Sequence, residues 1–224
     1  MSVDLTHTQP SVEAPPSGGA SHFGEPAWAK LCAFAAMLEA EGDVRGLLGP
    51  RELERLWSRH ILNSLAIEPD ISESASVADI GSGAGFPGIV LAIVRSDLSV
   101  TLIETMDRRV QWLEEMVEKL DLPHVQVLNA RAEELAGKVH FDVVTARAVA
   151  PLKKLVPWAF PLLKPAGIVV ALKGARAEIE IDEARKALRK FPITSVTVHE
   201  RDVWGTTEST RVVKVCAAKS TRSL

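Results

Sequence analysis

The sequence predicts an α/β protein with a mostly parallel β-sheet and helices on both of its faces. From residue 76 onward, short apolar segments typical of strands alternate with helical stretches. A glycine-rich turn follows the first strand directly, and the last two strands have no helix between them. Strand–helix alternation builds βαβ units. Their right-handed crossovers bring the carboxyl ends of the strands to one edge of the sheet, where such folds bind ligands.

The strands and helices of this sheet can be placed from their apolar periodicity. The predicted strands cover residues 76–80, 99–104, 124–130, 141–146, 167–173, about 193–201 and about 210–218. The predicted helices begin near Pro87 and cover 108–120, 151–163 and 175–190. Pro157 is expected to kink or break the third of these helices, because proline lacks an N–H and clashes with the preceding turn.

The residues before the sheet predict a tail and a helical cap. Residues 1–24 are rich in proline and glycine and have few large apolar side chains, so we expect a disordered tail. Apolar residues then recur at a helical period as far as Gly42: Trp28, Leu31, Ala35 and Leu38. A second helix is expected over 51–67, with His60 as a structural histidine on its apolar face. The cap thus covers 25–70, and the α/β domain covers 71–224.

The composition is that of an ordinary globular protein, with 46% hydrophobic and 25% charged residues among 224. Cys32 and Cys216 are too few for a disulfide framework or a zinc site, so no metal is expected. No ungapped apolar run reaches the roughly 18 residues of a membrane span. The N-terminus also lacks the basic and apolar segments of a signal peptide. We therefore expect a cytoplasmic protein with no membrane contact.

The net charge of −3 hides a division along the chain. Residues 1–130 contain 9 Lys and Arg against 19 Asp and Glu, whereas residues 131–224 contain 17 against 10. Such asymmetry points weakly to a polyanionic partner. Charged helix faces exposed to solvent would produce it equally well.

The strongest local signal is the segment VADIGSGAGFPGIVLAI, residues 77–93. Four glycines follow the strand directly: Gly81, Gly83, Gly85 and Gly88. Glycine permits positive φ and lets a ligand approach the backbone amides, because it has no Cβ. Pro87 suits the first turn of the next helix, whose N-terminus offers unpaired N–H groups to an anion. The segment therefore predicts a nucleotide-binding loop.

Two classes of nucleotide fit this loop. Residues 83–88 match the G-x-G-x-x-G dinucleotide fingerprint, and residues 81–85 match the G-x-G-x-G of S-adenosylmethionine (SAM) methyltransferases. Asp79 would repel a pyrophosphate but can reach the cationic end of a methionine moiety; its alternative role is to cap the strand end. Glu104 ends the second strand, from where an acid bonds ribose hydroxyls. NAD and SAM share that ribose, so Glu104 does not discriminate between them.

Further candidate residues follow the next strands. Ala132 and Glu133 can lie beside an adenine edge, or they simply begin a helix with acids in its first turn. Arg147 ends the fourth strand and can bind a carboxylate or phosphate bidentately, or it pairs at the surface with Glu133 or Glu134. A basic rim for RNA phosphates is predicted from the cations that follow the fourth and fifth strands: Arg147, Lys153, Lys154, Lys173 and Arg176.

Six segments, in this order, resemble those of one family: RHILNSL, VADIGSGAGFPGIVLAI, TLIETMDRRVQWLEE, NARAEEL, FDVVTARAVAPL and LKGARAEIE. Over residues 28–215 the chain is similar to the RsmG family, the 16S ribosomal RNA guanine-N7 methyltransferases formerly called glucose-inhibited division protein B. GSGAGFPG followed by TARAVAPL and LKG is far more specific than a glycine loop alone. The resemblance implies a bacterial SAM-dependent enzyme with a seven-stranded class I methyltransferase sheet behind a helical N-terminal cap.

The resemblance also implies roles for individual residues. Together with the loop residues discussed above, the predicted SAM site is lined by Asp79, Gly81, Gly83, Gly85, Phe86, Glu104, Ala132, Glu133 and Arg147. The resemblance places Gly81 and Phe86 on the methionine and ribose side of this site. Within it, Glu104 would hold the ribose, Ala132 and Glu133 the adenine, and Arg147 would close the site beside the target guanine. The chain departs from the family pattern at Val90, Glu104 and Val149; an aromatic residue is common at the last.

The implied reaction is the transfer of a methyl group to N7 of a guanosine in 16S rRNA. N7 has a free lone pair and no proton, so no general base is required. Arg147 and Lys173 are the candidate catalytic residues, as donors that orient guanine O6. The expected partner is 16S rRNA or the small ribosomal subunit, and the expected state is a monomer. Two other classes remain open: an NAD-dependent oxidoreductase, and a non-catalytic nucleotide- or RNA-binding module.

Overall fold

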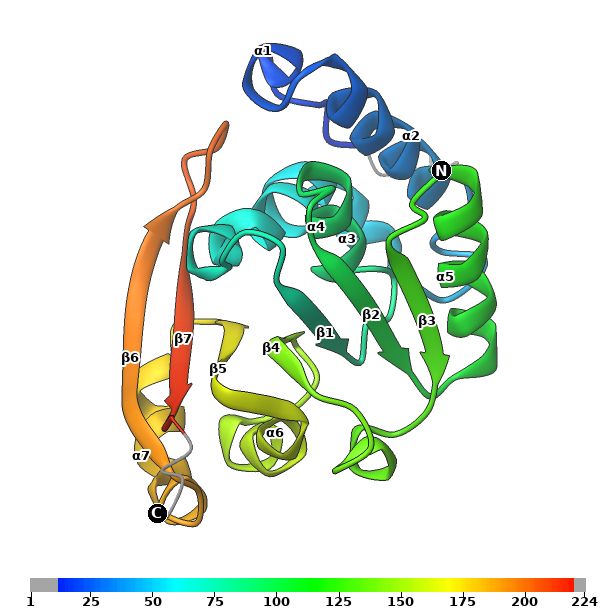
Figure 1. The fold of residues 1–224 in the computed structure, drawn as a ribbon. Coiled ribbons are helices and arrows are strands. Elements are labelled where there is room, and N and C mark those ends of the chain that lie inside the picture. Colours follow the sequence, from blue (N-terminus) through cyan, green and yellow to red (C-terminus); the bar gives the residue numbers. More distant parts are fainter. Residues whose placement is uncertain (1–11, 220–224) are drawn as a thin grey trace, which may run out of the picture.

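A seven-stranded sheet forms the centre of the molecule, in the order β3-β2-β1-β4-β5-β7-β6 (Figure 1). The structure, a computed structural model, describes residues 12–219. The strands are β1 (Ser76–Ile80), β2 (Ser99–Glu104), β3 (Val125–Asn129), β4 (Phe141–Arg147), β5 (Leu163–Lys173), β6 (Ile193–Asp202) and β7 (Ser209–Ala217). All seven lie close to their predicted positions; β5 begins four residues early. The predicted mostly parallel α/β sheet is confirmed.

The order of the sheet reverses at β1. Strands β1 to β5 pair in parallel, while β7 is antiparallel to both β5 and β6. Strand β2 lies on one side of β1 and strand β4 on the other, so Asp79 pairs in register with Leu102 and with Thr145. In open α/β sheets, the crevice outside the carboxyl ends of the strands at such a reversal is where ligands bind.

Helices cover both faces of the sheet (Figure 1). One face packs against α4 (Gly88–Val94), α5 (Asp107–Lys119) and the cap, which begins with α2 (Glu25–Glu41). The other face packs against α6 (Leu152–Ala159) and α7 (Ala177–Leu188). Side chains alternate between the two faces along a strand. In β4, Val143 therefore belongs to the core on the cap side and Val144 to the core beneath α6 and α7.

The second part of the cap is not the single helix expected over 51–67. It divides into α3 (Pro50–Leu53), the π-helical turn η1 (Leu56–Leu62) and the 3₁₀ turn η2 (Leu65–Asp70). Leu56, Trp57 and Ile61 are all buried on the sheet, so tertiary packing stabilises a backbone that periodicity cannot distinguish from an α-helix. A π-helical turn of this kind is frequent at functional sites.

Residues 12–24 are ordered against the body of the protein, which corrects the expected disorder over 1–24. They contain the short helix α1 (Gly19–Phe23). The carboxylate of Glu13 accepts the backbone N–H groups of Trp57 and Ser58, at 2.8 and 2.9 Å. The ring of His22 stacks on Trp204, with 4.1 Å between their centroids. The remainder of the expected tail, residues 1–11, lies outside the described residues.

Two further turns complete the chain trace. Pro157 lies within α6, which ends two residues later and continues as the 3₁₀ turn η4 (Phe160–Leu162). The 3₁₀ turn η3 (Ala132–Leu135) follows β3, and Glu134 caps it by accepting the Arg131 N–H at 3.1 Å.

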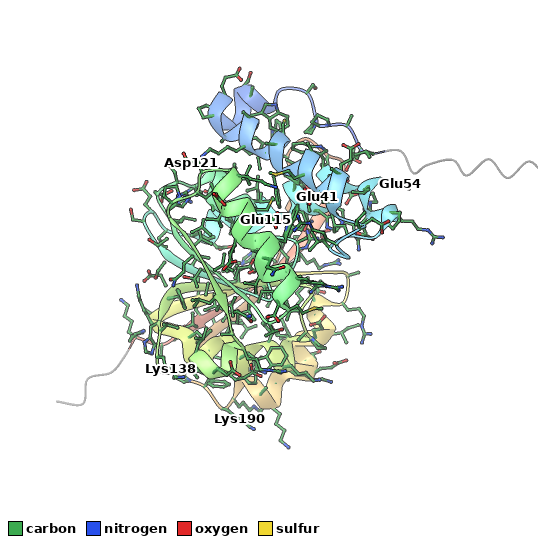
Figure 2. The ribbon with its side chains drawn as sticks, turned by 90° about the vertical axis from the view of Figure 1, so that its right-hand side faces the viewer. Glu41, Glu54, Glu115, Asp121, Lys138 and Lys190 are labelled. Carbon is green, nitrogen blue, oxygen red and sulfur yellow. The ribbon has the colours of Figure 1, made fainter. Side chains whose placement is uncertain are left out.

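The charge division of the sequence is also a division in space. Glu41, Glu54, Glu115 and Asp121 project from the half that contains the cap and α5, whereas Lys138 and Lys190 project from the opposite half (Figure 2). The four acids come from the acid-rich first part of the chain, and the two lysines from the basic second part.

Candidate active site

The glycine loop lies at the carboxyl end of β1, where the strand order reverses. Gly81, Gly83 and Gly85 have φ of 67°, 58° and 110°, a region that other residues rarely adopt. The Gly81 N–H donates to the Ile103 carbonyl at 2.7 Å. A Cβ on Gly81 would lie 2.7 Å from Cγ2 of Val149, so the loop after β4 lies directly over this position. Glycine is required here both for its conformation and for space.

The other glycines serve close packing within the protein. A Cβ on Gly85 would lie 2.8 Å from Cγ1 of Ile89, and one on Gly88 would lie 2.3 Å from Cδ2 of Leu102. Gly88 also places its N–H against Asp79. Part of the glycine pattern thus reflects the tight junction between β1 and α4 rather than contact with a ligand.

Asp79 is completely buried on the cap side of the sheet. Its Oδ2 accepts the Gly88 N–H at 3.0 Å, so one oxygen has the capping role that the sequence also allows. Its Oδ1 has no hydrogen-bond partner among the described residues, and neither has the hydroxyl of Thr145, its register neighbour in β4. Burial raises the pKa of Asp79 to about 7. A buried carboxylate oxygen without a partner is well suited to receive a cationic group.

Glu104 ends β2, is almost completely buried and holds the glycine loop. Its Oε2 accepts the Gly83 N–H at 3.0 Å, and its Oε1 accepts the N–H groups of Thr105 and Met106 at 2.7 and 3.0 Å. The carboxylate oxygens retain lone pairs for a ribose hydroxyl, but their first partners are the protein's own amides. Ala132 is buried and Glu133 exposed in the first turn of η3, which is the arrangement of a helix start with acids in its first turn.

Arg147 lies between the glycine loop and the cap. Its guanidinium lies over the Phe86 ring, 4.9 Å from the centroid. Its Nη1 donates to the carbonyl oxygens of Arg59 and His60 at 3.1 and 3.2 Å, and its Nη2 donates to Nδ1 of His60. The alternative expected from the sequence, a surface pair with an acid of η3, is not formed. Burial, together with the charge of Arg59, lowers the pKa of Arg147 to about 10, so it remains a cation at pH 7.

The side chain of Lys173 projects from one face of the sheet, and that of Arg147 projects from the other. Arg147 pairs in register with Leu172, so the next residue along β5 points toward α6 and α7. There the Lys173 ammonium contacts Oε2 of Glu180 at 2.9 Å and donates to the Ala150 carbonyl at 2.7 Å. Its side chain is buried, so the structure favours a structural ion pair for a residue that the sequence suggests as catalytic.

Two acids of α7 pair with three of the five cations of the predicted basic rim. Glu183 pairs with Lys153 at 3.6 Å and with Arg176 at 3.3 Å, and Glu180 pairs with Lys173. Glu180 and Glu183 lie about one and two turns after the start of α7. Their order in the sequence does not show that they face the rim. The rim is therefore a mixed surface and not a uniformly basic one.

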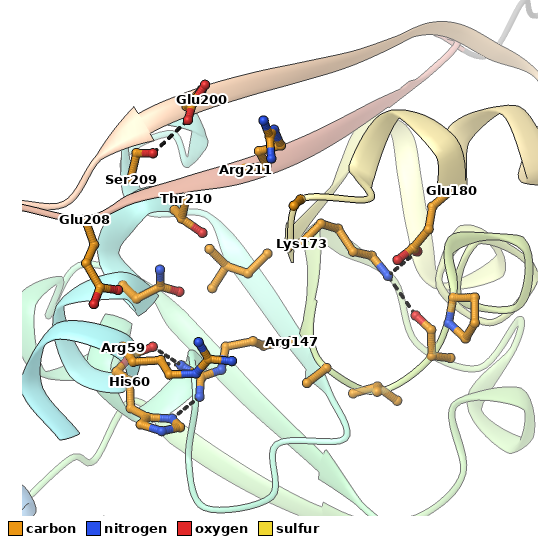
Figure 3. A pocket seen from close by; sticks show the side chains of 18 of the residues that line it. Arg59, His60, Arg147, Lys173, Glu180, Glu200, Glu208, Ser209, Thr210 and Arg211 are labelled. Atoms are coloured by element: carbon orange, nitrogen blue, oxygen red, sulfur yellow. Dashed lines mark hydrogen bonds and ion pairs between the residues drawn. The ribbon is translucent and has the colours of Figure 1, made fainter. Parts of the chain in front are cut away.

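A cavity of about 700 Å³ opens beside Arg147 (Figure 3). The cap supplies one wall with Glu52, Arg59, His60 and Asn63; the ends of β4 and β5 supply residues 147–151 and 172–175; and the β6–β7 hairpin supplies Glu200, Glu208, Ser209, Thr210 and Arg211. Glu208 also pairs with Arg55 of the cap at 2.5 Å, which joins the hairpin to the cap. The sequence does not identify the cap and hairpin residues, because they meet only in the folded chain.

His60, which the sequence predicts to be structural, forms hydrogen bonds on both sides of its ring. Its Nε2 lies 2.6 Å from Oε2 of Glu52, while Nδ1 faces Arg147. Burial and the charge of Arg147 lower the pKa of His60 to about 4, so the ring is neutral at pH 7. Glu52 and His60 are eight positions apart, about two helical turns. This spacing is the feature of the sequence from which their contact could have been predicted.

Two general features of the described residues bear on the expected partners. Within residues 12–219, no group of three or more His, Cys, Asp and Glu side chains is arranged to hold a metal ion. No helix in the same range combines the length and the apolar character needed to cross a bilayer.

Comparison with known proteins identifies the family. Residues 27–203 match the family described as GidB, rRNA small subunit methyltransferase G. A protein of Beutenbergia cavernae named ribosomal RNA small subunit methyltransferase G is 51% identical over 182 residues, 81% of this chain and 86% of its own length. One of the same name from Clavibacter sepedonicus is 46% identical over 208 residues, 93% of this chain and 98% of its own.

The fold is that of solved methyltransferases. A methyltransferase from Pyrococcus furiosus superposes with a TM-score of 0.55 at 16% identity, covering 69% of this chain and 80% of its own. The class I methyltransferase fold that the resemblance implies is therefore confirmed. This fold and the family match over residues 27–203 show that the chain is a methyltransferase and belongs to the family of rRNA small subunit methyltransferase G.

Proposed function

We propose that this protein transfers the methyl group of SAM to N7 of a guanosine in 16S rRNA. The proposal rests on the family to which the chain belongs and on the position of Arg147 in its structure. One guanidinium contacts Phe86 of the glycine loop and also lines the 700 Å³ cavity. It thus joins the proposed cofactor side of the site to the proposed substrate side.

The residues around the glycine loop fit SAM. The unpartnered, buried Oδ1 of Asp79 suits the ammonium of the methionine moiety. Glu104 ends the strand next to β1 and suits ribose hydroxyls, and the small side chain of Ala132 suits the edge of an adenine. Bound SAM supplies an electrophilic methyl group on a sulfonium. The chain's own task is to hold the acceptor in line with that group and to exclude water.

The cavity suits a single unstacked guanosine. At about 700 Å³ it lies within the range of small-molecule sites in proteins. Enzymes that modify a base inside structured nucleic acid first remove it from the stack, so the RNA must be open or bulged at the target. Arg147 borders the cavity as a donor for guanine O6. Lys173, the other candidate donor, also borders the cavity, but its ammonium already contacts Glu180 and the Ala150 carbonyl, so we assign it a structural role.

No general base is needed for this reaction. Guanine N7 is unprotonated and attacks with its own lone pair, so catalysis comes mainly from alignment, which can supply up to about 7–11 kcal/mol. The neutral, internally bonded His60 is consistent with this. Family membership argues against hydride transfer to or from NAD and against a non-catalytic module. We further propose that the protein acts as a monomer in the cytoplasm on 16S rRNA or the small subunit.

The proposal is tested by mapping N7-methylguanosine. Purified protein and SAM are incubated with free 16S rRNA and, separately, with small subunits that lack the modification, and the RNA is analysed by mass spectrometry after nuclease digestion. We expect one N7-methylguanosine per RNA in at least one of the two substrates. Methylation at another atom, or none in either substrate, would refute the proposal. Comparing the substrates also shows which of them the enzyme uses.

A further inference from the structure

The guanidinium of Arg147 is anchored by neutral groups of the cap. Its partners are two backbone carbonyls of the π-helical turn η1 and the imidazole Nδ1 of His60. Within residues 12–219, no carboxylate forms an ion pair with it; the charges that shift its pKa are those of Arg59, Asp79 and Glu52. A carboxylate partner would neutralise the guanidinium, whereas these acceptors fix its position and leave its charge available to a ligand oxygen.

His60 can accept from Arg147 only in one tautomer. Nδ1 must be unprotonated, so the ring proton lies on Nε2, where it is donated to Oε2 of Glu52 at 2.6 Å. Glu52 therefore fixes the tautomer, as carboxylates commonly do for functional histidines. The imidazole is almost completely buried and also packs against the Phe86 ring, 5.4 Å between centroids. Its orientation is thus determined from three sides.

We propose that His60 is a positioning residue for methyl transfer, which holds Arg147 over Phe86 through a tautomer set by Glu52. The helical cap is then part of the catalytic machinery and not only a cover for the sheet. This inference rests on the proposed function, in which Arg147 orients the guanine. It assigns His60 no proton transfer, because N7 has no proton to remove.

The test compares two amides that replace different ring nitrogens. His60→Asn places a carbonyl oxygen near the position of Nδ1 and can still accept from Arg147. His60→Gln places its amide near Nε2 and can contact Glu52 but not Arg147. We expect His60→Asn to keep kcat within about threefold and His60→Gln to lose at least about tenfold, the scale of one hydrogen bond to a charged group. Melting temperatures are measured for both variants.

The outcomes separate positioning from stability. The positioning role is wrong if the two variants lose kcat only in proportion to their loss of melting temperature. It is also wrong if His60→Gln is as active as the wild type. If the wild type itself produces no N7-methylguanosine, the proposed function fails instead. Should either variant not fold, Glu52→Gln and Glu52→Leu repeat the test: the amide oxygen of Gln still accepts from Nε2, and Leu does not. Activity retained by Gln and lost by Leu supports the inference, and equal activity overturns it.

Discussion

The guanidinium of Arg147 lies 4.9 Å from the centroid of the Phe86 ring, and this contact joins the end of β4 to the glycine loop after β1. The two residues are 61 positions apart in the sequence, but Arg147 ends β4 and Phe86 follows β1, the strand beside it in the sheet. A buried cation–π contact of this kind contributes up to about 2 kcal/mol. It also places a positive charge next to the loop, at the edge where the strand order reverses.

Arg147→Ala should impair methyl transfer far more than folding. Removal of one preorganised donor typically slows an enzyme by about 100- to 1,000-fold. Folding loses the Phe86 contact, up to about 2 kcal/mol, and the three hydrogen bonds to the cap, so the rate is compared at equal concentrations of folded protein. The initial rate of methyl incorporation and the urea-induced unfolding curve measure the two effects. Arg185→Ala, on the exposed side of α7, is the control. Full activity of Arg147→Ala on small subunits would exclude a catalytic role.

Gly81→Asp should abolish SAM binding while the fold persists. The substitution introduces a side chain whose Cβ alone would lie 2.7 Å from Val149, at the mouth of the loop. Gly137→Asp is a matched control, because Gly137 has a similar φ of 74° and no atom lies within 4 Å of the place its Cβ would take. Calorimetric titration with SAM is expected to show no heat of binding for the first variant and unchanged affinity for the second. Equal SAM affinity in the two variants would show that Gly81 does not belong to the SAM site.

Lys173 and Glu180 should behave as a structural pair. Lys173→Met alone removes the cationic partner of Glu180, whose Oε2 keeps the Leu152 N–H, and should lower the free energy of unfolding by about 1–3 kcal/mol. The double variant Lys173→Met with Glu180→Met should recover part of that stability, because neither charge remains, although the Leu152 N–H loses its acceptor. Its activity then decides the role of Lys173. Wild-type turnover confirms a structural pair, and a loss of turnover in a stable double variant shows that Lys173 acts on the substrate.

Asp79→Asn should remove a dependence of stability on pH. The pKa of Asp79 is raised by burial from 3.8 to about 7, so between these values the folded chain binds more protons at this site than the unfolded chain does. The contribution of Asp79 to stability is therefore complete below about pH 4 and is lost as the pH rises through about 7. His60, whose pKa is lowered to about 4, acts in the opposite direction, losing its contribution as the pH falls below 6.5.

Comparing Asp79→Asn with the wild type cancels the effect of His60. The free energy of unfolding is measured for both proteins at pH 5 and at pH 8. The variant should gain stability relative to the wild type between the two, since only the wild type must bury an ionised carboxylate at pH 8. A difference that is the same at both pH values would show that Asp79 titrates near its ordinary pKa.

The sheet could be predicted because its signals are local. Buried parallel strands such as β1 and β4 are short apolar runs bounded by turn residues, and the amphipathic helix α5 shows its period directly. The glycine loop could be identified for the same reason. Residues 12–24 could not be predicted, since their order comes from distant contacts, such as Glu13 with the turn at Trp57 and His22 with Trp204.

The amino-acid pattern alone was sufficient for the order of strands and helices, the glycine loop and the family resemblance, because each depends on neighbours within a few turns of chain. The partners of the site residues were decided by folding. Arg147 and Lys173 are the last residues of neighbouring strands, yet their side chains leave opposite faces of the sheet. Arg147 therefore contacts His60 of the cap, and Lys173 contacts Glu180 of α7. Those contacts span 87 and 7 positions, and they arise where register and packing bring the cap, the sheet and α7 to one edge.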